Sequence, residues 1–391
     1  MNSVISNSAA SAPPRADGGD LFDSASYSDF VRAAMRIRQA RPDVSLLFES
    51  TIREPADQLL EVIREAFSTD VSSRYVSVFT DGNHFAIEAV CKRYGLRPDQ
   101  IIATTGVTSG LVMLFRALLS PGDRVLAERP GFDLVARLAT AAGAVVQDLP
   151  RIAPGYGIDL VDLEARLRTG VRLVVITNLH NPSGMRLSSD EIAAIGVVCD
   201  RAGTILVVDE VYADFAVAAG APAAAGMGPN IVSTSSLTKV FGLFALKFGW
   251  LAADAQLIAR IRAMVPEGDF GVSKLSHAVA AHVLEAPAAF EAHWQAVLSV
   301  TRPIIEREIG ELIRAGYLEG TLPEFGCMCF PRIPGVADTR AFARRLLAEH
   351  DLVVAPGEFF GAAGHIRIGY GSDARSMAVG LSRLREALSR R

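Results

Sequence analysis

Lysine is rare in this chain of 391 residues, so each lysine is a candidate for chemistry. Only Lys92, Lys239, Lys247 and Lys274 occur among the 39 basic residues, and the rest are arginine. Two of the four stand eight positions apart in STSSLTKVFGLFALKFGW, residues 233–250. Lys239 lies in an apolar, glycine-containing stretch, a setting that lowers the pKa of an amine. A lysine amine with a lowered pKa is what imine (Schiff-base) chemistry requires.

Two further candidates follow strand-like segments earlier in the chain. Gly106, Val107, Thr108 and Ser109 follow the run IIATT and precede a helical pattern. Backbone N–H groups and hydroxyls at a helix N-terminus can hold a phosphate, although Ser and Thr also cap helices for structural reasons alone. Phe132 follows RVLAE in a loop, where an aromatic side chain stacks on a planar ring or simply packs.

Polar side chains also follow two apolar runs in the middle of the chain. Asn181 begins a turn after LVVITN, and its amide has a donor for a ring oxygen, although Asn-Pro pairs often only make turns. Asp209 and then Tyr212 follow TILVV. A carboxylate at the end of a buried strand needs a cationic or hydrogen-bonding partner, and either a protonated ring nitrogen or the N–H groups of the next turn can serve.

The elements that must position these residues alternate between apolar strands and helical patterns. Strands are predicted at 101–105, 124–128, 173–178, 204–209, 230–235 and 249–253, with helical spacing at 109–119 and 189–203 between them. This alternation predicts a mostly parallel sheet covered on both faces by helices, with ligands bound beyond the carboxyl ends of its strands. All five candidate positions stand at such ends.

The rest of the chain predicts a second, smaller α/β domain built from both chain ends. Long helical patterns at 273–286 and 290–316 are followed by short strands at 326–333, 352–357 and 365–370. We expect an unstructured tail over 1–26, an N-terminal part of the small domain over 27–70, a large domain over 71–266, and an interdomain helix with the C-terminal small domain over 267–391.

Composition restricts the classes of function. A net charge of -4 and a pI near 6.0 argue against nucleic-acid binding, and small soluble partners fit better. Mean hydropathy is +0.27, but no apolar run reaches the roughly 18 residues that a membrane span needs, and the N-terminus has no signal-peptide pattern. The four cysteines are expected to be buried free thiols without a metal. We therefore expect a cytoplasmic enzyme.

In combination, these motifs resemble the fold-type I pyridoxal-phosphate (PLP) enzymes, specifically the class I/II aminotransferases of the aspartate aminotransferase superfamily. The resemblance extends from about Leu46 to Leu388, and it is carried by HNPSG, VVDEVY, SSLTKVFGL and HIRIGY in that order. It implies a seven-stranded large sheet, PLP as cofactor and two-subunit active sites. A homodimer is therefore expected.

The resemblance also implies catalytic roles. Lys239 forms the imine with PLP and later moves the substrate's proton as general acid and base. Asp209 pairs with the ring nitrogen, while Asn181 and Tyr212 hold the ring hydroxyl. Phe132 stacks on the ring.

The remaining residues that the resemblance implies bind the phosphate and the substrate. Val107, Thr108 and Ser236 bind the phosphate, and Tyr75 reaches the phosphate of the neighbouring subunit. The segment 267–278 is also expected to reach across to the neighbour's phosphate. Lys247 stands where the family usually has arginine, so a point charge replaces a two-pronged contact, either with an altered phosphate site or with no effect.

Two features bear on the substrate. Arg367 in HIRIGY is expected to bind the α-carboxylate as a bidentate fork. The segment Glu49, Ser50, Thr51 and Arg53 stands where the family usually has a glycine-containing loop beside the substrate, and it either tunes substrate choice or, for Arg53, lies at the surface. The apolar segment EFGCMCF favours a neutral or aromatic amino acid.

We therefore expect amino-group transfer between an L-amino acid and a 2-oxo acid by a ping-pong mechanism. The alternative within the family is β-elimination of a sulfur substrate or another carbanion reaction, because PLP stabilises the same carbanion in each. A transcriptional regulator built on this fold is disfavoured, because few residues precede the resemblance and none form a basic domain.

Overall fold

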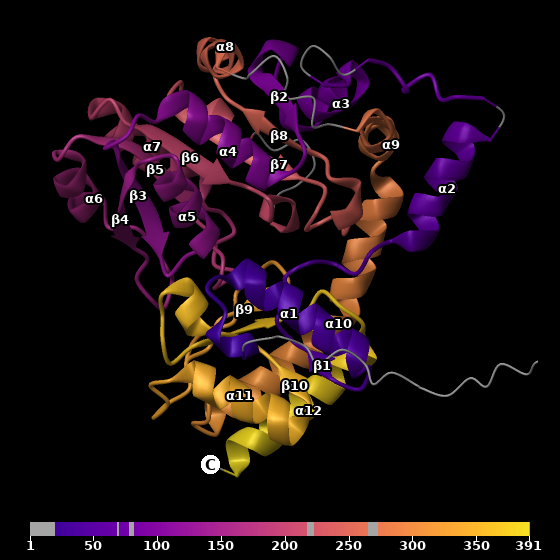
Figure 1. Cartoon of the computed structure of the whole chain (residues 1–391), viewed down its shortest axis with the longest axis vertical. Helices are drawn as coiled ribbons and strands as arrows, with labels where there is room; N and C mark the ends of the chain where they lie inside the picture. Colours follow the sequence, from indigo (N-terminus) through magenta and orange to yellow (C-terminus); the bar gives the residue numbers. More distant parts are fainter. Residues whose placement is uncertain (1–19, 69, 78–81, 217–222, 265–272, 391) are drawn as a thin grey trace, which may run out of the picture.

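The computed structural model describes residues 20–68, 70–77, 82–216, 223–264 and 273–390. Its larger part, the upper half of Figure 1, is built on a seven-stranded sheet with the order β2-β8-β7-β6-β5-β3-β4. In that order the strands are β2 (Ile101–Thr104), β8 (Gly249–Ala252), β7 (Ile231–Ser236), β6 (Ile205–Asp209), β5 (Val171–Thr177), β3 (Arg124–Arg129) and β4 (Val145–Pro150). Only β8 runs antiparallel to its neighbours. The predicted α/β fold with a mostly parallel seven-stranded sheet is confirmed.

Helices cover both faces of this sheet, and alternate strand residues point into the two resulting cores. In β5, Leu173 and Val175 join the core under α4 (Val107–Leu118), α5 (Asp133–Ala141) and α8 (Ala255–Ala263). Val174 and Ile176 join the core under α6 (Leu160–Leu167) and α7 (Ser189–Arg201). Burial on both sides explains why the central strands read as continuous apolar runs.

The sequence prediction missed β4. This strand lies at the edge of the sheet and is half exposed, and its residues VVQDLP carry two polar side chains and a proline. An edge strand is buried less than a central one, so its apolar pattern is weaker and proline is tolerated there.

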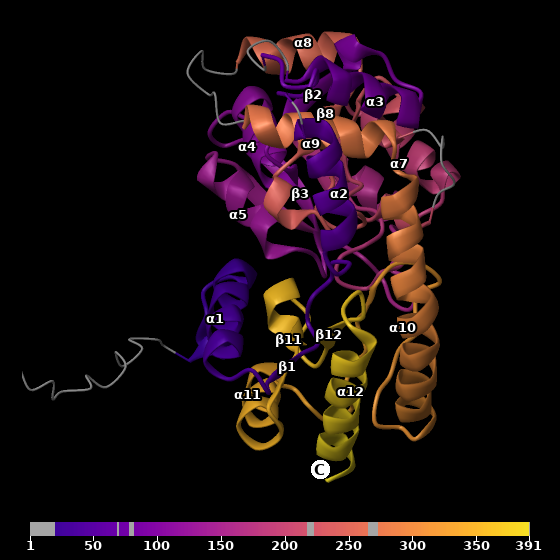
Figure 2. The ribbon, with the colours of Figure 1, turned by 90° about the vertical axis from the view of Figure 1, so that its right-hand side faces the viewer.

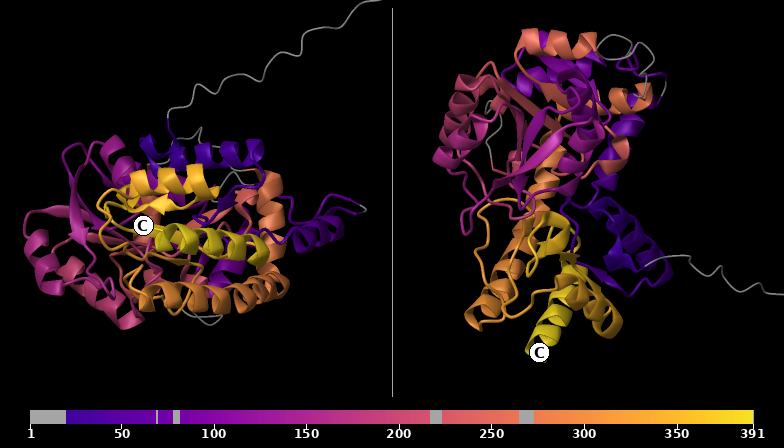
Figure 3. Two further views of the ribbon diagram at one scale, coloured as in Figure 1. Left: turned by 90° about the horizontal axis from the view of Figure 1, so that it is seen from below. Right: turned by 60° about the vertical axis from the view of Figure 1, so that its left-hand side comes forward.

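The smaller part of the molecule combines both ends of the chain. Its strands are β1 (Ser45–Leu46), which pairs in parallel with β10 (Leu352–Val353), and an antiparallel sheet of β11 (Ala355–Pro356), β12 (Ile366–Gly369) and β9 (Met328–Cys329). Around them lie α1 (Tyr27–Ala40), α11 (Thr339–His350) and α12 (Ala374–Ser389). Seen from below in Figure 3, the indigo N-terminal helix lies beside the yellow C-terminal helices.

Long helices link the two parts and flank the large sheet. Helix α10 (Ala288–Arg314) runs from the upper to the lower half, as Figure 2 shows. Helices α2 (Ala56–Phe67), α3 (His84–Tyr94) and α9 (Lys274–Glu285) pack with one another through α9 beside the large sheet. Within the described residues there are also six short 3-10 helices: η1 (Leu21–Asp23), η2 (Pro98–Gln100), η3 (Ala213–Phe215), η4 (Ala224–Met227), η5 (Phe244–Leu246) and η6 (Gly357–Phe360).

The N-terminal tail differs in part from expectation. Residues 1–19 lie outside the described residues, but Leu21 and Phe22 are buried in η1, which contacts α11. Burial of two large apolar side chains is sufficient reason for residues 20–26 to be ordered. The other proposed domain limits, at residues 70 and 266, stay predictions.

The sequence also led to expectations about the cysteines, membrane spans and metal sites. All four cysteines are buried free thiols, as predicted. Across the described ranges, no helix combines the length and apolar character needed to cross a bilayer, and no group of three His, Cys, Asp or Glu residues could hold a metal ion.

Candidate active site

Most of the predicted site residues lie at one edge of the large sheet. Because β8 is antiparallel to both β2 and β7, strands β2, β7, β6, β5 and β3 all end at this edge. Asp209 and Ser236 are the last residues of β6 and β7, and Asn181 follows β5 in a loop. The smaller part faces this edge, since Arg367 of β12 contacts Asn181 directly. The site therefore lies between the two parts of the chain.

Lys239 lies in the turn after β7 and is held by the segment that follows β1. Its Nζ donates a hydrogen bond to Thr51 Oγ1 at 3.0 Å, and its carbonyl oxygen accepts from the Ile52 N–H at 3.1 Å. Burial, and secondarily the positive charge of Arg367, lowers the pKa of the amine to about 8. About a fifth of this amine is therefore neutral near pH 7.4, far more than for an ordinary lysine, and the neutral form is the one that acts as a nucleophile or accepts a proton.

Asp209 is a buried carboxylate that lacks a cationic partner within the described residues. Its side chain is 6% exposed, and Oδ1 accepts a hydrogen bond from the Val211 N–H at 3.0 Å. Burial raises the pKa of this carboxyl to about 7, although Val211 and Lys239 oppose the rise. A cationic group placed against Asp209 would restore its ionised form, because an opposite charge nearby favours the charged state.

Arg367 is 1% exposed and makes several contacts across the interface between the two parts. Nη1 donates to Asn181 Oδ1 at 2.8 Å, and Nη2 donates to the Phe48 carbonyl at 2.9 Å and to the Tyr27 hydroxyl. Its Nε is buried without a partner among the described residues. The guanidinium is therefore fixed, with one donor still unmatched.

Aromatic side chains surround this cation. The Tyr27 ring lies 4.6 Å from the Arg367 guanidinium carbon, and Phe132 meets Tyr27 edge-on at 5.9 Å between ring centroids. Tyr212 is buried, shares a 2.8 Å hydrogen bond with Ser50 Oγ, and has its pKa raised by burial. The structure thus places Phe132, Tyr212 and Arg367 around Tyr27 and Ser50 between the two parts of the chain.

The turn before α4 provides free backbone donors. Gly106 has φ 106° and offers no side-chain cap, so the first N–H groups of α4, from Val107 onward, have no capping side chain. Thr108 is exposed beside them, and Ser109 Oγ donates to the Gly106 carbonyl at 3.0 Å. A Cβ on Gly249 would lie 2.8 Å from Gly106 Cα, so only glycine lets β8 pack against this turn. This N-terminus is suited to bind an anion.

The two other predicted phosphate ligands have local contacts. Ser236 Oγ accepts from the Thr238 N–H at 3.3 Å and so shapes the turn that carries Lys239. Lys247 is exposed, and its Nζ lies 3.5 Å from the centre of the Phe244 ring. Burial lowers the pKa of this amine. Its predicted contact with a phosphate stays a prediction.

Tyr75 lies away from these residues within the chain. It is 37% exposed, and the Lys274 Nζ lies 4.2 Å from the centre of its ring. Part of the segment 267–278, which was expected to reach the neighbouring subunit, lies outside the described residues. The role of Tyr75 in a shared site stays a prediction.

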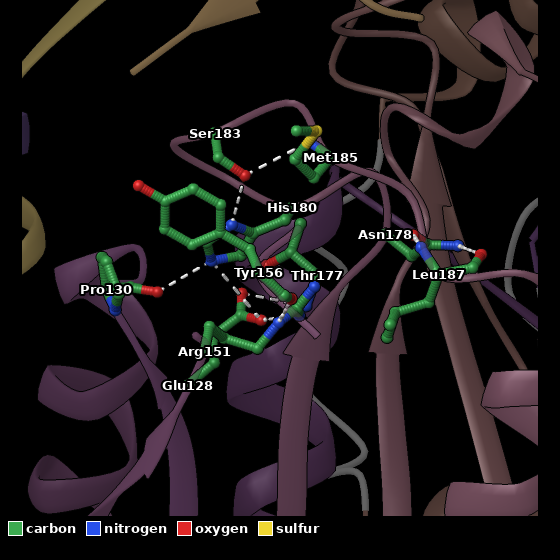
Figure 4. A network of polar contacts seen from close by, with 10 residues as sticks. All are labelled: Glu128, Pro130, Arg151, Tyr156, Thr177, Asn178, His180, Ser183, Met185 and Leu187. Atoms are coloured by element: carbon green, nitrogen blue, oxygen red, sulfur yellow. Dashed lines mark hydrogen bonds and ion pairs between the residues drawn. The ribbon is translucent and has the colours of Figure 1, made fainter. Parts of the chain in front are cut away.

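A buried polar network behind the site fixes the loop that carries Asn181 (Figure 4). Glu128, near the end of β3, accepts from the Thr177 N–H at 3.0 Å and pairs with Arg151 at 2.6 Å. Burial raises the pKa of the Glu128 carboxyl, and the Arg151 guanidinium opposes that rise. The Glu128 carboxylate therefore takes the place of the backbone carbonyl that would accept from the Thr177 N–H if β3 and β5 continued to pair here.

His180 extends this network into the loop itself. Its Nε2 bonds the Pro130 carbonyl at 2.8 Å and its Nδ1 bonds Ser183 Oγ at 2.6 Å. Burial and the neighbouring Arg151 hold the pKa of His180 well below its usual value, so the ring is neutral at pH 7 and accepts the Ser183 proton. Asn181, next in sequence, is thereby held towards Arg367.

Comparison with known proteins identifies the family. The sequence model for aminotransferase class I and II matches residues 47–384. The chain belongs to this family. Class I and II aminotransferases of this fold use PLP, so the protein is a PLP-dependent enzyme of the aminotransferase family.

Named relatives of this aminotransferase differ in their activities. It is 30% identical over 320 residues to the capreomycidine synthase of Streptomyces vinaceus, covering 80% of this chain and 81% of that protein. It is 28% identical to an arginine–pyruvate transaminase of Pseudomonas aeruginosa, covering 75% and 74% of the two chains.

Solved structures share the fold. The aspartate aminotransferase of Thermus thermophilus superposes with a TM-score of 0.81 at 20% identity, covering 93% of this chain and 96% of that one. The PLP-dependent cyclase OrfR superposes with a TM-score of 0.78 at 25% identity, covering 97% and 99%.

The residues of this aminotransferase fit PLP. The cofactor has an aldehyde, a protonated ring nitrogen and a phosphate, and supplies an electron sink for the substrate. Lys239 offers an amine of lowered pKa for the aldehyde, and Asp209 offers the ring nitrogen a buried carboxylate that has no cationic partner among the described residues. Gly106 leaves the N-terminus of α4 without a capping side chain, so its N–H groups can bind the phosphate. These three needs match the three groups of PLP.

Several site residues had no signal in the sequence. Tyr27 stands near the expected tail, Glu128 was treated as part of a strand, and Thr51 was named only as part of a segment of open role. These residues are far along the chain from the motifs, for example 188 positions between Thr51 and Lys239, so the sequence does not reveal their contacts. A polar residue inside an apolar strand, as Glu128 is in RVLAE, was the only available indication.

Proposed function

We propose that this protein transfers the amino group of an L-amino acid to a 2-oxo acid by a ping-pong mechanism. The observation that carries the proposal is the juxtaposition of Lys239, with its pKa lowered to about 8, and the buried Asp209 at the sheet edge, opposite Arg367. Bound PLP supplies the electron sink that lets the substrate Cα lose its proton.

We propose the following roles for the residues. Arg367 binds the substrate α-carboxylate and, with Asn181, orients the Cα–H bond. Lys239 Nζ removes the Cα proton and returns it during transfer, because an amine whose pKa lies near the working pH can both accept and donate a proton. Asp209 holds the proton on the cofactor ring nitrogen, and Tyr212, backed by Ser50, donates a hydrogen bond to the ring oxygen.

For the cofactor, we propose that Val107, Thr108, Ser236 and Lys247 hold the phosphate and that Phe132 packs on the ring. The uncapped α4 N-terminus supports the first two assignments. We also propose a cytoplasmic homodimer in which Tyr75 completes the partner's phosphate site. Helix α2 supports a dimer, because none of its residues is buried and Leu60 and Ile63 are 44% and 39% exposed.

The test is a half-reaction monitored by absorbance. PLP-loaded protein is mixed with single amino acids without any oxo acid, and then with single oxo acids after removal of the amino acid. We expect the cofactor to convert to its aminated form in the first step and to return in the second. Formation of an oxo acid and ammonia from one substrate without aminated cofactor would instead support the elimination reaction.

Borohydride reduction followed by peptide mass mapping tests Lys239 independently. We expect the cofactor to be attached to Lys239, and attachment to be lost in Lys239→Ala. Lys92→Ala is the matched control, because Lys92 is an exposed lysine on α3 and its removal should change nothing. Attachment at Lys247 would contradict the proposed roles of both lysines.

A further inference from the structure

The segment 48–51 contributes contacts to three site residues, and Glu49 stands in its middle. The Phe48 carbonyl accepts from Arg367 at 2.9 Å, Ser50 Oγ bonds the Tyr212 hydroxyl at 2.8 Å, and Thr51 Oγ1 accepts from Lys239 at 3.0 Å. The Ser50 and Thr51 side chains bond to site residues, whereas the Glu49 side chain between them and Phe48 forms no hydrogen bond to any described residue.

The backbone of Glu49 is fixed against β12. The Gly369 N–H donates to the Leu47 carbonyl at 2.6 Å, and a Cβ on Gly369 would lie 1.8 Å from the Glu49 carbonyl oxygen. Only glycine permits this approach, so Glu49 is held beside the strand that carries Arg367. The position of its side chain at the site therefore follows from sheet packing and not from a free loop.

The Glu49 carboxylate has no partner of its own. Among the described residues it forms no hydrogen bond, and no cation lies within 4.0 Å, although the side chain is half-buried. It acts electrostatically on Lys239, Arg38 and Tyr27, which places it close to the catalytic amine and to the tyrosine that contacts Arg367. Burial raises its pKa, so the carboxylate lacks compensation for lost hydration.

The cations near Glu49 are already engaged. Arg38 donates to the Val44 carbonyl, and Arg367 donates to Asn181, Tyr27 and Phe48. Lys239 is attached to PLP in the loaded enzyme and then offers no ammonium group to Glu49. These side chains therefore leave Glu49 without a matched positive charge close to the catalytic amine, where the proposed function places the substrate.

We propose that the enzyme selects amino acids whose side chains end in a cation, a guanidinium or an ammonium group, and that Glu49 is the partner of that cation. This inference rests on the proposed function, because it assumes that Arg367 binds the α-carboxylate. This proposal differs from the neutral or aromatic substrate that the sequence predicted, and the experiments below decide between them.

Binding without reaction tests the site directly. Calorimetry on PLP-loaded enzyme compares 5-guanidinopentanoate, which lacks an α-amino group, with octanoate, a carboxylate of matching chain length whose other end is an uncharged methyl group. We expect the guanidino acid to bind roughly tenfold or more tightly, as a charge-assisted hydrogen bond allows. Equal affinities for the two acids would overturn the proposal.

Variants assign the preference to Glu49. Glu49→Gln keeps the size of the side chain and should abolish the preference, while Glu49→Asp keeps the charge and should retain part of it. Glu54→Gln is the matched control, since Glu54 is exposed five positions further on. The visible cofactor band verifies that each variant is loaded. A preference that survives in Glu49→Gln would overturn the proposal.

The half-reaction separates this inference from the proposed function. We expect arginine, lysine or ornithine to aminate the cofactor at least tenfold faster than leucine or phenylalanine. Equal or faster conversion by the neutral donors would overturn the inference while leaving amino-group transfer intact. Tight binding of the guanidino acid without conversion by any donor would support the cation site and contradict amino-group transfer.

Discussion

Lys239 combines a chemical requirement with a position that the fold provides. Only a primary amine can form the imine with PLP, so a chain that otherwise uses arginine has lysine here. Burial near Arg367 then lowers the pKa of this amine to about 8, and Thr51 orients it. Residue type and environment thus act together on one atom.

The lowered pKa of Lys239 predicts how cofactor attachment depends on pH. The neutral amine is the nucleophile and predominates above the pKa, so the attachment rate should rise about tenfold per pH unit up to roughly pH 8 and then level off. Stopped-flow absorbance with PLP and cofactor-free protein from pH 6 to 10 measures this profile. A rate that keeps rising between pH 9 and 10 would show an ordinary lysine pKa.

The residue type at position 247 does not by itself determine how the phosphate site is built. The family usually has arginine at this position, and the sequence predicted either an altered phosphate site or a neutral replacement. The structure shows the amine over the Phe244 ring. The consequence of the replacement for phosphate binding stays a prediction.

At the scale of elements, the Glu128–Arg151 pair links β3, β5 and the Asn181 loop. Both side chains are nearly inaccessible, at 5% and 0% exposed. Removing one partner of a buried pair leaves the other charge uncompensated. We expect Glu128→Gln to lower the free energy of unfolding by about 3 kcal/mol.

Urea unfolding followed by circular dichroism measures this change. The matched control is Glu164→Gln on α6, whose 3.6 Å pair with Arg168 is exposed at both ends and should contribute less than about 0.5 kcal/mol. Equal effects of the two variants would mean that the buried network does not stabilise the loop.

At the scale of the whole molecule, the exposed apolar face of α2 predicts the assembly. Replacing Leu60 and Ile63 together by aspartate should convert a dimer into a monomer, because two charges cannot be buried unpaired at an apolar interface. Sedimentation should then give the 41.7 kDa mass of one chain. Val197→Asp on α7, at a site 50% exposed, is the control. A double variant that still sediments as a dimer would place the interface elsewhere.

Local sequence patterns determined the large sheet and the residues at its edge. Apolar runs that alternate with helical spacing predict parallel strands, and parallel strands place Asp209, Ser236 and Lys239 at one edge whatever the rest of the chain does. The same reasoning missed edge strand β4, because this strand is half exposed and polar side chains interrupt its apolar pattern.

Only the tertiary structure decided what faces that edge. Thr51 reaches Lys239 across 188 positions, and Tyr27 reaches Arg367 across 340, because β1 pairs with β10 and brings both chain ends together over the sheet. Glu49 enters the site by the same pairing. Local propensity carries no information about contacts between segments so far apart, since those contacts depend on how two separately patterned units pack.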